Sequence, residues 1–258
     1  MTRLIAVASG KGGVGKTTTT CNLGVALSQL EKSVIALDAN LTTPNIGLHL
    51  GMHKPMVSLN DVLEDRANIV DAIALHESGL RVVPAGLSMK HLRTLNPDRL
   101  WNVVLDLFGS ADFVLLDTPA GLEKGAKSVL EAGEEVIVVT NPETPALTDA
   151  LKTTRMAYRS GAYVLGCVLN RVRGESHEVT VEEVESMLDI PVIGTIPEDP
   201  EIRKSIRHGG PVVYSRPNSP AAKAYRKLAA DIAGIEFELA AEGRGVVNVL
   251  KKFFGIAE

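Results

Sequence analysis

Residues Gly10–Thr18 read GKGGVGKTT, and this stretch decides both the fold and the class of ligand. It has the form G-x-x-x-x-G-K-T, a glycine-rich loop whose backbone N–H groups cradle the α- and β-phosphates of a nucleotide. We expect Lys16 to reach the β- and γ-phosphate oxygens and the Thr17 hydroxyl to coordinate Mg²⁺. The sequence therefore predicts nucleotide binding by the whole loop: Gly10, Lys11, Gly12, Gly13, Val14, Gly15, Lys16, Thr17 and Thr18.

Short apolar runs alternate with helical patterns along most of the chain, and such runs are typical of strands covered on both faces. We expect strands at Leu4–Ala8, Ser33–Asp38, Leu80–Pro84, Phe113–Asp117, Glu135–Asn141, Ala162–Asn170 and Val192–Thr195. We expect helices at Lys16–Leu30, Leu59–Leu63, Pro97–Phe108, Lys124–Ala132, Pro145–Arg159, Val179–Leu188 and Ala221–Ala233. The alternation predicts a single-domain α/β P-loop NTPase fold, with a mostly parallel central sheet flanked by helices on both faces.

Polar residues stand where four of the expected strands end: Asp38, Asp117, Asn141 and Asn170. The carboxyl ends of parallel strands meet at one edge of a sheet, and ligands bind at that edge. Asp117 ends an apolar strand, where a carboxylate can hold a Mg²⁺-bound water. We therefore predict that Thr17 and Asp117 form the metal site.

Composition limits the remaining classes of function. The chain has 258 residues, of which 45% are hydrophobic and 22% charged, and its net charge of −4 gives no overall field that favours nucleic acid. Its two cysteines, Cys21 and Cys167, are far apart in sequence and form no metal-binding motif, which suits a reducing cytosol. No apolar run approaches the ~20 residues of a membrane-spanning helix.

The lysine after the first glycine, Lys11, makes the loop more specific, because it gives the pattern K-G-G-x-G-K-T. This pattern resembles the deviant Walker A ATPases, a family that includes MinD, the ParA partition ATPases and iron–sulfur carriers of the Mrp type. Asp38–Asn40 with Asn45–Leu48 resembles the first switch of the family, and Leu115–Gly121 resembles the second. Thr140–Glu143 matches the T-N-P-E run of MinD proteins. Leu169–Arg171 and Ile196–Asp199 resemble the two segments that hold adenine. The resemblance is closest to MinD and implies an ATPase that binds ATP, ADP and Mg²⁺.

The resemblance also implies roles for single residues. It implies that Gly121 offers a backbone N–H to the γ-phosphate, and that Lys11 reaches across a two-fold axis to the phosphates of a partner subunit. The remaining implied nucleotide contacts are Glu143, Asn170, Arg171, Pro197 and Asp199, of which Asn170 reads the adenine edge through its amide. With Lys11 and Lys16, the implied catalytic residues are Asp38 and Asn40.

Asn40 departs from the family pattern, in which this position is a second aspartate that positions or activates the attacking water. Asparagine is almost isosteric with aspartate but neutral, so it cannot accept a proton as a carboxylate does. We therefore expect ATP binding and dimer formation to persist while hydrolysis is slow or absent. Asp38 keeps one carboxylate close to this position.

The last residues form a separate amphipathic segment, so we divide the chain into an ATPase domain at 1–239 and a hinge with a membrane-targeting helix at 240–258. Residues 246–256 read VVNVLKKFFGI, and at about 100° per residue the apolar and cationic side chains separate onto two faces. Such a helix lies in a membrane interface, and its position and K-K-F-F-G ending resemble the MinD tail. The predicted membrane contacts are Val246, Val249, Leu250, Lys251, Lys252, Phe253 and Phe254.

The expected partners follow from these features: a second copy of the chain in the ATP state, an anionic lipid membrane, and a regulatory or cargo protein that the sequence does not identify. We expect a cytoplasmic protein at the inner membrane face, with no specific nucleic acid. Three alternatives remain open. They are a ParA-like partition ATPase that binds DNA non-specifically, an iron–sulfur carrier, and an ATP-locked scaffold that does not hydrolyse. A tail that docks on its own body or in a partner's groove is the alternative to lipid.

Overall fold

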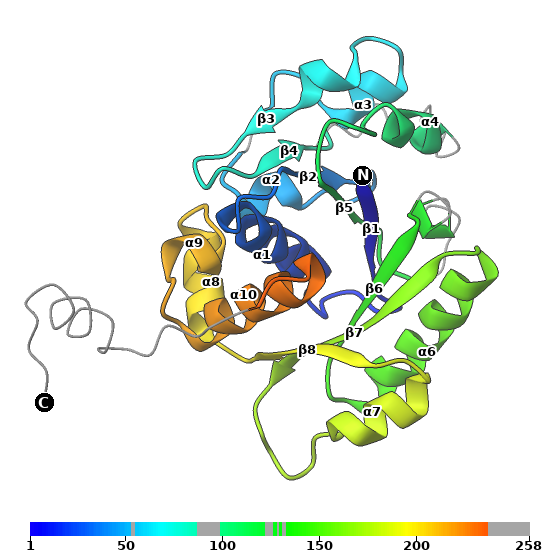
Figure 1. Cartoon of the computed structure of the whole chain (residues 1–258), viewed down its shortest axis with the longest axis vertical. Helices are drawn as coiled ribbons and strands as arrows, with labels where there is room; N and C mark the ends of the chain where they lie inside the picture. The colour runs from blue at the N-terminus through cyan, green and yellow to red at the C-terminus, as the bar shows by residue number, and fades with distance from the viewer. Residues whose placement is uncertain (53–54, 87–98, 122–125, 128, 131–132, 237–258) are drawn as a thin grey trace, which may run out of the picture.

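The central sheet has the strand order β3-β4-β2-β5-β1-β6-β7-β8 (Figure 1). The structure is a computed structural model, and it describes residues 1–52, 55–86, 99–121, 126–127, 129–130 and 133–236. All described strand pairs are parallel except β3 with β4. The strands are β1 (Arg3–Ala8), β2 (Val34–Asp38), β3 (Ala74–Leu75), β4 (Arg81–Val83), β5 (Phe113–Asp117), β6 (Glu135–Thr140), β7 (Tyr163–Val172) and β8 (Val192–Pro197).

Helices cover both faces of this sheet, as the alternation predicts. They are α1 (Lys16–Gln29), α2 (Ile46–His49), α3 (Leu59–Leu63), the 3₁₀ helix η1 (Ile69–Ala72), α4 (Leu100–Leu105), α6 (Thr144–Arg159), α7 (Val181–Leu188), α8 (Pro200–Arg207), α9 (Val212–Ser215) and α10 (Pro220–Ala233). In Figure 1, α1, α8, α9 and α10 lie on one side of the sheet and α6 and α7 on the other. Within the described residues, no helix is both long and apolar enough to cross a membrane.

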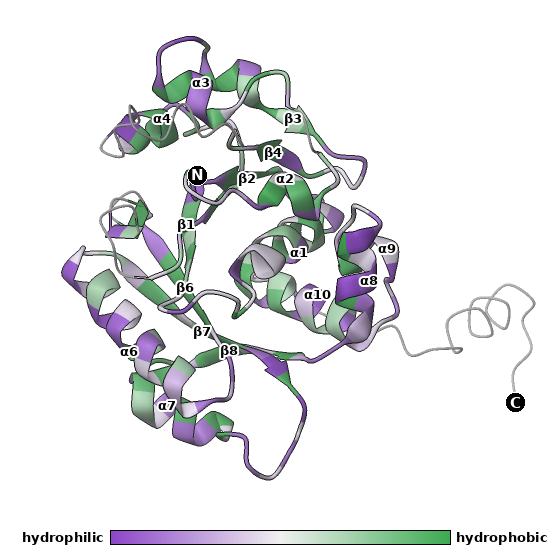
Figure 2. Ribbon diagram, turned by 180° about the vertical axis from the view of Figure 1, so that it is seen from behind, coloured by the Kyte–Doolittle hydropathy of each residue, from purple (hydrophilic) through white to green (hydrophobic). Residues whose placement is uncertain are grey.

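Two hydrophobic cores result, one on each face of the sheet. Successive residues of a strand point to opposite faces, so Ile5 and Val7 of β1 pack with α1 and α10, while Leu4 and Ala6 pack with the helices of the other face. Tyr225 of α10 is fully buried in the first core. Figure 2 shows hydrophobic residues dominating the central strands, whereas α8 is largely hydrophilic.

The predicted fold is confirmed, and all seven expected strands are present with ends shifted by at most two residues. The predicted helix Pro97–Phe108 is shorter than expected, since α4 spans Leu100–Leu105 among the described residues. Most of the predicted helix Lys124–Ala132 lies outside the described residues. The short elements α2, β3, η1 and α9, together with α8, were not predicted.

Candidate nucleotide-binding site

Strand register places the two aspartates side by side at the carboxyl edge of the sheet. Asp38 of β2 is the direct partner of Asp117 of β5, and Asp117 also pairs with Val7 of β1. The glycine-rich loop follows β1 directly, so it starts beside both carboxylates. Because β1 lies between β5 and β6, the chain leaves it at the point where crossovers diverge to the two halves of the sheet, the usual ligand position in such folds.

The loop has the backbone that a phosphate cradle requires. Gly15 has φ 105° and stands at the N-terminal end of α1, whose first turn is capped by no side chain of the described residues. The free N–H groups there and the helix dipole favour an anion. A Cβ at Gly15 would lie 2.1 Å from Asn170 Nδ2, so only glycine fits this approach. Lys16 is 8% exposed, and burial lowers its pKa while Asp117 opposes that shift.

Thr17 and Asp117, the two predicted metal ligands, are in direct contact. The Thr17 hydroxyl donates to Asp117 Oδ2 at 2.6 Å, and the Thr20 hydroxyl lies 3.4 Å from Oδ1. Asp117 is fully buried, and burial raises its pKa although the Thr17 hydrogen bond and Lys16 lower it. A hard cation between these oxygen ligands would offset the unfavourable burial of the carboxylate, so the pair fits Mg²⁺.

Asp38 holds the backbone of the first switch segment. Its Oδ2 accepts the N–H groups of Asn45 (2.8 Å) and Ile46 (2.9 Å), and its Oδ1 accepts the N–H of Asn40 (3.2 Å). Burial and then the charge of Asp117 raise the pKa of Asp38. These contacts position the segment 40–46, while the predicted catalytic role of Asp38 stays a prediction.

Asn40 lines a cavity beside the glycine-rich loop, and its side chain is hydrogen-bonded to Thr43. Its Oδ1 accepts the Thr43 N–H at 3.1 Å, and its Nδ2 donates to Thr43 Oγ1 at 3.0 Å. The side chain is 8% exposed. The cavity has a volume of about 400 Å³ and is lined by Gly12, Gly13, Gly15, Lys16, Thr17, Thr18, Asn40, Thr43, Asn45, His49, Ala120, Arg171 and Ile206.

A smaller pocket of about 40 Å³ adjoins it where β7 and β8 end, lined by Gly15, Thr18, Asn170, Arg171, Glu198, Asp199, Ile202 and Arg203. Asn170 Nδ2 donates to Val14 O at 2.7 Å and so ties β7 to the loop. Its Oδ1 is buried and has no hydrogen-bond partner among the described residues. Such an orphan acceptor is unfavourable when the pocket is empty and matches an amino group on a base.

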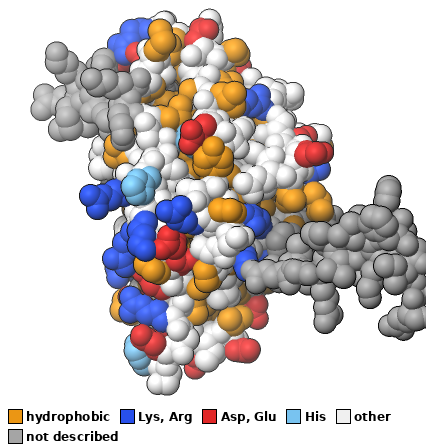
Figure 3. Space-filling view, turned by 90° about the vertical axis from the view of Figure 1, so that its left-hand side faces the viewer, with side chains coloured by type: hydrophobic (Ala, Val, Ile, Leu, Met, Phe, Trp, Pro, Cys, Tyr) orange, Lys and Arg blue, Asp and Glu red, His pale blue; other side chains and the backbone are white. Residues whose placement is uncertain are grey.

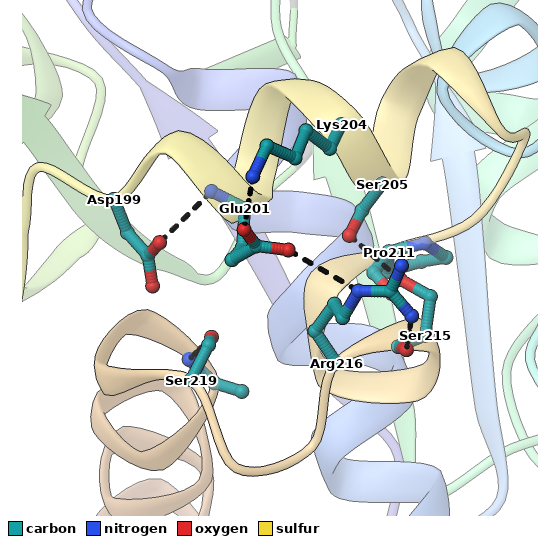
Figure 4. A network of polar contacts seen from close by, with 9 residues as sticks. Asp199, Glu201, Lys204, Ser205, Pro211, Ser215, Arg216 and Ser219 are labelled. Atoms are coloured by element: carbon teal, nitrogen blue, oxygen red, sulfur yellow. Dashed lines mark hydrogen bonds and ion pairs between the residues drawn. The ribbon is translucent and has the colours of Figure 1, made fainter.

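Asp199 lines this pocket, and its carboxylate accepts hydrogen bonds from the backbone of two helices (Figure 4). One oxygen caps α8 by accepting the Glu201 N–H at 2.9 Å, and the other accepts the Ala221 N–H of α10 at 3.2 Å. Both carboxylate oxygens of Asp199 are therefore already paired within the protein, and the predicted nucleotide contacts of Pro197 and Asp199 stay predictions. Pro197 ends β8 beside Val172.

Lys11, Gly121 and Glu143 are not among the residues that line the two pockets. Lys11 is exposed, and Glu143 is an exposed residue at the N-terminal end of α6. The Gly121 N–H donates to Ser9 O at 3.2 Å, so the predicted γ-phosphate contact requires that bond to be exchanged. The predicted membrane residues lie outside the described residues.

The two pockets are also lined by residues that were not predicted from the sequence. Ile202, Ile206 and Arg203 come from α8, and the Asp199–Pro200 pair was the available signal, because it is a typical helix start. His49, at the end of α2, lines the larger cavity. No local pattern announced it, because a four-residue helix has no periodicity.

Comparison with known proteins agrees with this geometry. The ParA family model, described as a NUBPL iron-transfer P-loop NTPase, matches residues 1–233. An uncharacterized ATP-binding protein of Methanocaldococcus jannaschii is 41% identical, with coverage of 91% of this chain and 89% of that protein. The septum site-determining protein MinD of Synechocystis is 33% identical, with coverage of 91% and 90%.

Solved structures give the same answer. The cell division ATPase MinD of Pyrococcus furiosus superposes with a TM-score of 0.88 at 41% identity, covering 91% of this chain and 99% of that one. MinD of Pyrococcus horikoshii in complex with Mg-ADP superposes with a TM-score of 0.87 at 39% identity, covering 90% and 96%. The chain therefore belongs to the MinD/ParA family of P-loop ATPases, which use ATP and Mg²⁺.

Proposed function

We propose that this chain is a MinD-like nucleotide switch: ATP pairs two copies, the pair binds the cytoplasmic membrane face through its tails, and the bound pair positions a partner protein. The observation that supports it best is the convergence of the loop, the Thr17–Asp117 pair and the orphan Asn170 Oδ1 on one pair of adjoining pockets. Its relatives include proteins named septum site-determining protein MinD, and a similar solved structure is the complex of MinC with MinD from Aquifex aeolicus.

The chain's own residues account for nucleotide binding. The loop amides and Lys16 hold phosphate, Asn170 Oδ1 accepts from the adenine amino group, and Thr17 with Asp117 holds Mg²⁺. Mg²⁺ neutralises phosphate charge during phosphoryl transfer. Lys11 is exposed beside these groups, as a residue that reaches a second subunit must be. In the pair, each Lys11 adds positive charge where phosphate charge develops.

Asn40 sets the hydrolysis rate in this proposal, because the amide cannot take a proton from the attacking water. Asn40→Asp suits the site sterically, since the substituted carboxylate can accept from the Thr43 N–H and from the Thr43 hydroxyl, which replaces the bond that Nδ2 donates. A general base contributes roughly 10²–10⁴-fold to a rate, so we expect Asn40→Asp to release phosphate at least tenfold faster. Asn45→Asp is the matched control, because it adds the same charge to the same segment. Equal rates in wild type and Asn40→Asp contradict the proposed role.

The tail supplies membrane affinity only in the paired state. A helix of about eleven residues is marginal in water, so one copy binds lipid weakly, whereas a pair gains through effective concentration. The test combines light scattering with co-sedimentation on anionic phosphatidylglycerol-containing vesicles, in Mg·ATP and in Mg·ADP. We expect a dimer and lipid binding in Mg·ATP, and loss of lipid binding but not of the dimer in Phe253→Glu. A monomer in saturating Mg·ATP, or undiminished sedimentation of Phe253→Glu, refutes the proposal.

The DNA-binding alternative has less support. Cations of α8 and its neighbours are paired with carboxylates: Arg203 with Glu198, and Lys204 and Arg216 with Glu201. Figure 3 shows acidic side chains among the basic ones on this face. Phosphate backbones require unneutralised cations, so salt-dependent DNA retention is not expected in Mg·ATP.

The iron–sulfur carrier alternative needs accessible thiolates. Cys21 and Cys167 are buried, and burial raises the pKa of both thiols, further for Cys21 through Asp117 and for Cys167 through Glu185. Buried, protonated thiols are poor metal ligands. Within the part of the chain that the structure describes, no group of three or more His, Cys, Asp or Glu side chains is arranged to hold a metal.

A further inference from the structure

His49 is the last residue of α2, and both of its ring nitrogens have partners. Nδ1 lies 2.9 Å from the main-chain oxygen of Asn45, and Nε2 lies 3.3 Å from Thr18 Oγ1. Thr18 belongs to the phosphate loop and lines both pockets, while His49 lines the larger one beside Lys16. Helix α2 thus places the titratable side chain of His49 against Thr18, a residue that is predicted to bind nucleotide.

These contacts fix the roles of the two nitrogens. A carbonyl oxygen can only accept, so Nδ1 carries the hydrogen that is donated to Asn45 O. In a neutral ring Nε2 is then an acceptor, and the Thr18 hydroxyl must donate to it. Burial lowers the pKa of His49, and the Asn45 hydrogen bond only partly opposes this. Without bound nucleotide, these surroundings favour the neutral ring.

We infer that His49 is a proton-linked nucleotide contact: phosphate in this cavity turns the ring into an imidazolium whose Nε2–H faces Thr18 and the phosphate. This inference rests on the proposed nucleotide function. A phosphate oxygen competes for the Thr18 hydroxyl proton, and Nε2 keeps its contact with Thr18 only by becoming a donor. Because Nδ1 already carries a hydrogen, that change requires a second proton, which the solvent supplies.

The surrounding charges favour this change only when phosphate is present. The elements packed on α2 are α1, β2 and α8. Lys16 of α1 and Arg171 near the end of β7 line the cavity and oppose a further cation, while Asp38 of β2 holds the start of α2 and favours one. From α8, Ile206 lines the cavity, and the cations nearest to it in sequence, Lys204 and Arg207, are exposed. A bound diphosphate or triphosphate adds negative charge beside the ring, so protonation follows binding.

The test is calorimetric titration of the full chain with Mg·ADP, which binds without being hydrolysed. Wild type, His49→Gln and the control Leu48→Gln are titrated at about pH 6, 7 and 8, in two buffers that differ in ionisation enthalpy. Leu48 neighbours His49 on α2 and is exposed, outside the lining of both pockets. The difference between proteins removes the titration of the nucleotide, of Asp38 and of Asp117, which all variants share.

We expect wild type and Leu48→Gln to take up more protons than His49→Gln on binding. A bound-state pKa raised by about one unit corresponds to a tenfold change in affinity, so affinity should fall between pH 6 and pH 8 by about three- to tenfold more than in His49→Gln. Equal proton uptake and equal pH slopes in wild type and His49→Gln overturn the inference while leaving nucleotide binding intact. No binding by wild type overturns the proposed function as well.

A second measurement needs no variant at this position to fold. The ring protons of His49 are followed by NMR across pH in wild type, with and without Mg·ADP. A pKa that rises on binding is the expected result, and a pKa that is unchanged or falls refutes the inference.

Discussion

Three glycines of the phosphate loop allow backbone strain and steric clash to be measured separately. Gly12 has a negative φ, and a Cβ there would come no closer than 3.9 Å to Ala120. Gly13 has φ 81°, with no described atom within 4 Å of an added Cβ. Gly15 combines φ 105° with a Cβ that would lie 2.1 Å from Asn170 Nδ2. Alanine at the three positions therefore tests neither effect, strain alone, and both together.

The magnitudes follow from these geometries. A left-handed conformation costs a non-glycine residue about 1–2 kcal/mol, and the stiffer unfolded chain returns about 0.4–1 kcal/mol of that. Gly13→Ala should therefore lower the free energy of unfolding by about 1 kcal/mol. Gly15→Ala must also displace Asn170, which leaves the buried Val14 carbonyl unpaired at about 1–3 kcal/mol more. Gly12→Ala should stay within about 0.5 kcal/mol of wild type.

The assay is urea unfolding of the nucleotide-free chain, supported by thermal melts. For a domain of this size, 1 kcal/mol corresponds to roughly 2–4 °C in Tm, so Gly15→Ala should melt at least 4 °C below wild type. The double variant Gly15→Ala with Asn170→Ala removes the clash and should lose less than the two single variants together. If Gly15→Ala is as stable as Gly13→Ala, the close contact between residue 15 and Asn170 is refuted.

Three further outcomes are expected. Asn170→Ala should weaken Mg·ATP binding about five- to tenfold in titration calorimetry, because one hydrogen bond of about 1–1.5 kcal/mol is lost, and its preference for ATP over GTP should narrow. The raised pKa values of Asp38 and Asp117 mean that the folded state holds protons that the unfolded state releases, so stability is fullest at acidic pH and falls as pH rises through neutrality. Urea unfolding at about pH 6 and pH 8.5 should show this loss, and millimolar Mg²⁺ should reduce it, whereas unchanged stability contradicts the shared burial of the two carboxylates. Asp199→Ala should lower the free energy of unfolding by about 1–2 kcal/mol through the lost cap of α8, measurable in the same assay, with Asp231→Ala as the exposed control.

The sequence predicts the parts of this site that depend on local chemistry. The glycine-rich loop needs its glycines wherever it stands, so the phosphate cradle could be recognised before the fold was known. Asp117 and Asn170 could be predicted because each lies at, or within two residues of, the carboxyl end of an apolar strand, and all such ends meet at one sheet edge. Neither inference requires a distance, since the parallel topology alone brings these positions together.

The rest depends on tertiary packing that leaves no periodic trace. That Asp38 binds backbone rather than solvent follows from the path of residues 40–46, and nothing in D-A-N announces it. Asp38 of β2 accepts hydrogen bonds from the backbone at the start of the four-residue helix α2. This contact between β2 and α2 holds the helix that carries His49 to the cavity. The antiparallel strand β3 has two residues, too few for any alternation to be read. Trp101 stands in an apolar helical run yet is 40% exposed, because α4 lies at the surface.

The site concentrates features that are unfavourable unless a ligand pairs with them. Two buried carboxylates lie side by side, the first turn of α1 is capped by no described side chain, and the Asn170 Oδ1 lacks a partner among the described residues. Mg²⁺ would pair with the carboxylates, phosphate with the N–H groups of α1, and the base with Asn170 Oδ1. Nucleotide should therefore stabilise the fold by more than it would if these groups already had partners within the protein. The first switch segment is held by Asp38 and His49, and both of these groups change their electrostatic surroundings when phosphate and Mg²⁺ bind. Its conformation is therefore coupled to occupancy of the pocket, and this coupling is the physical requirement for a switch whose output is the pairing of two copies.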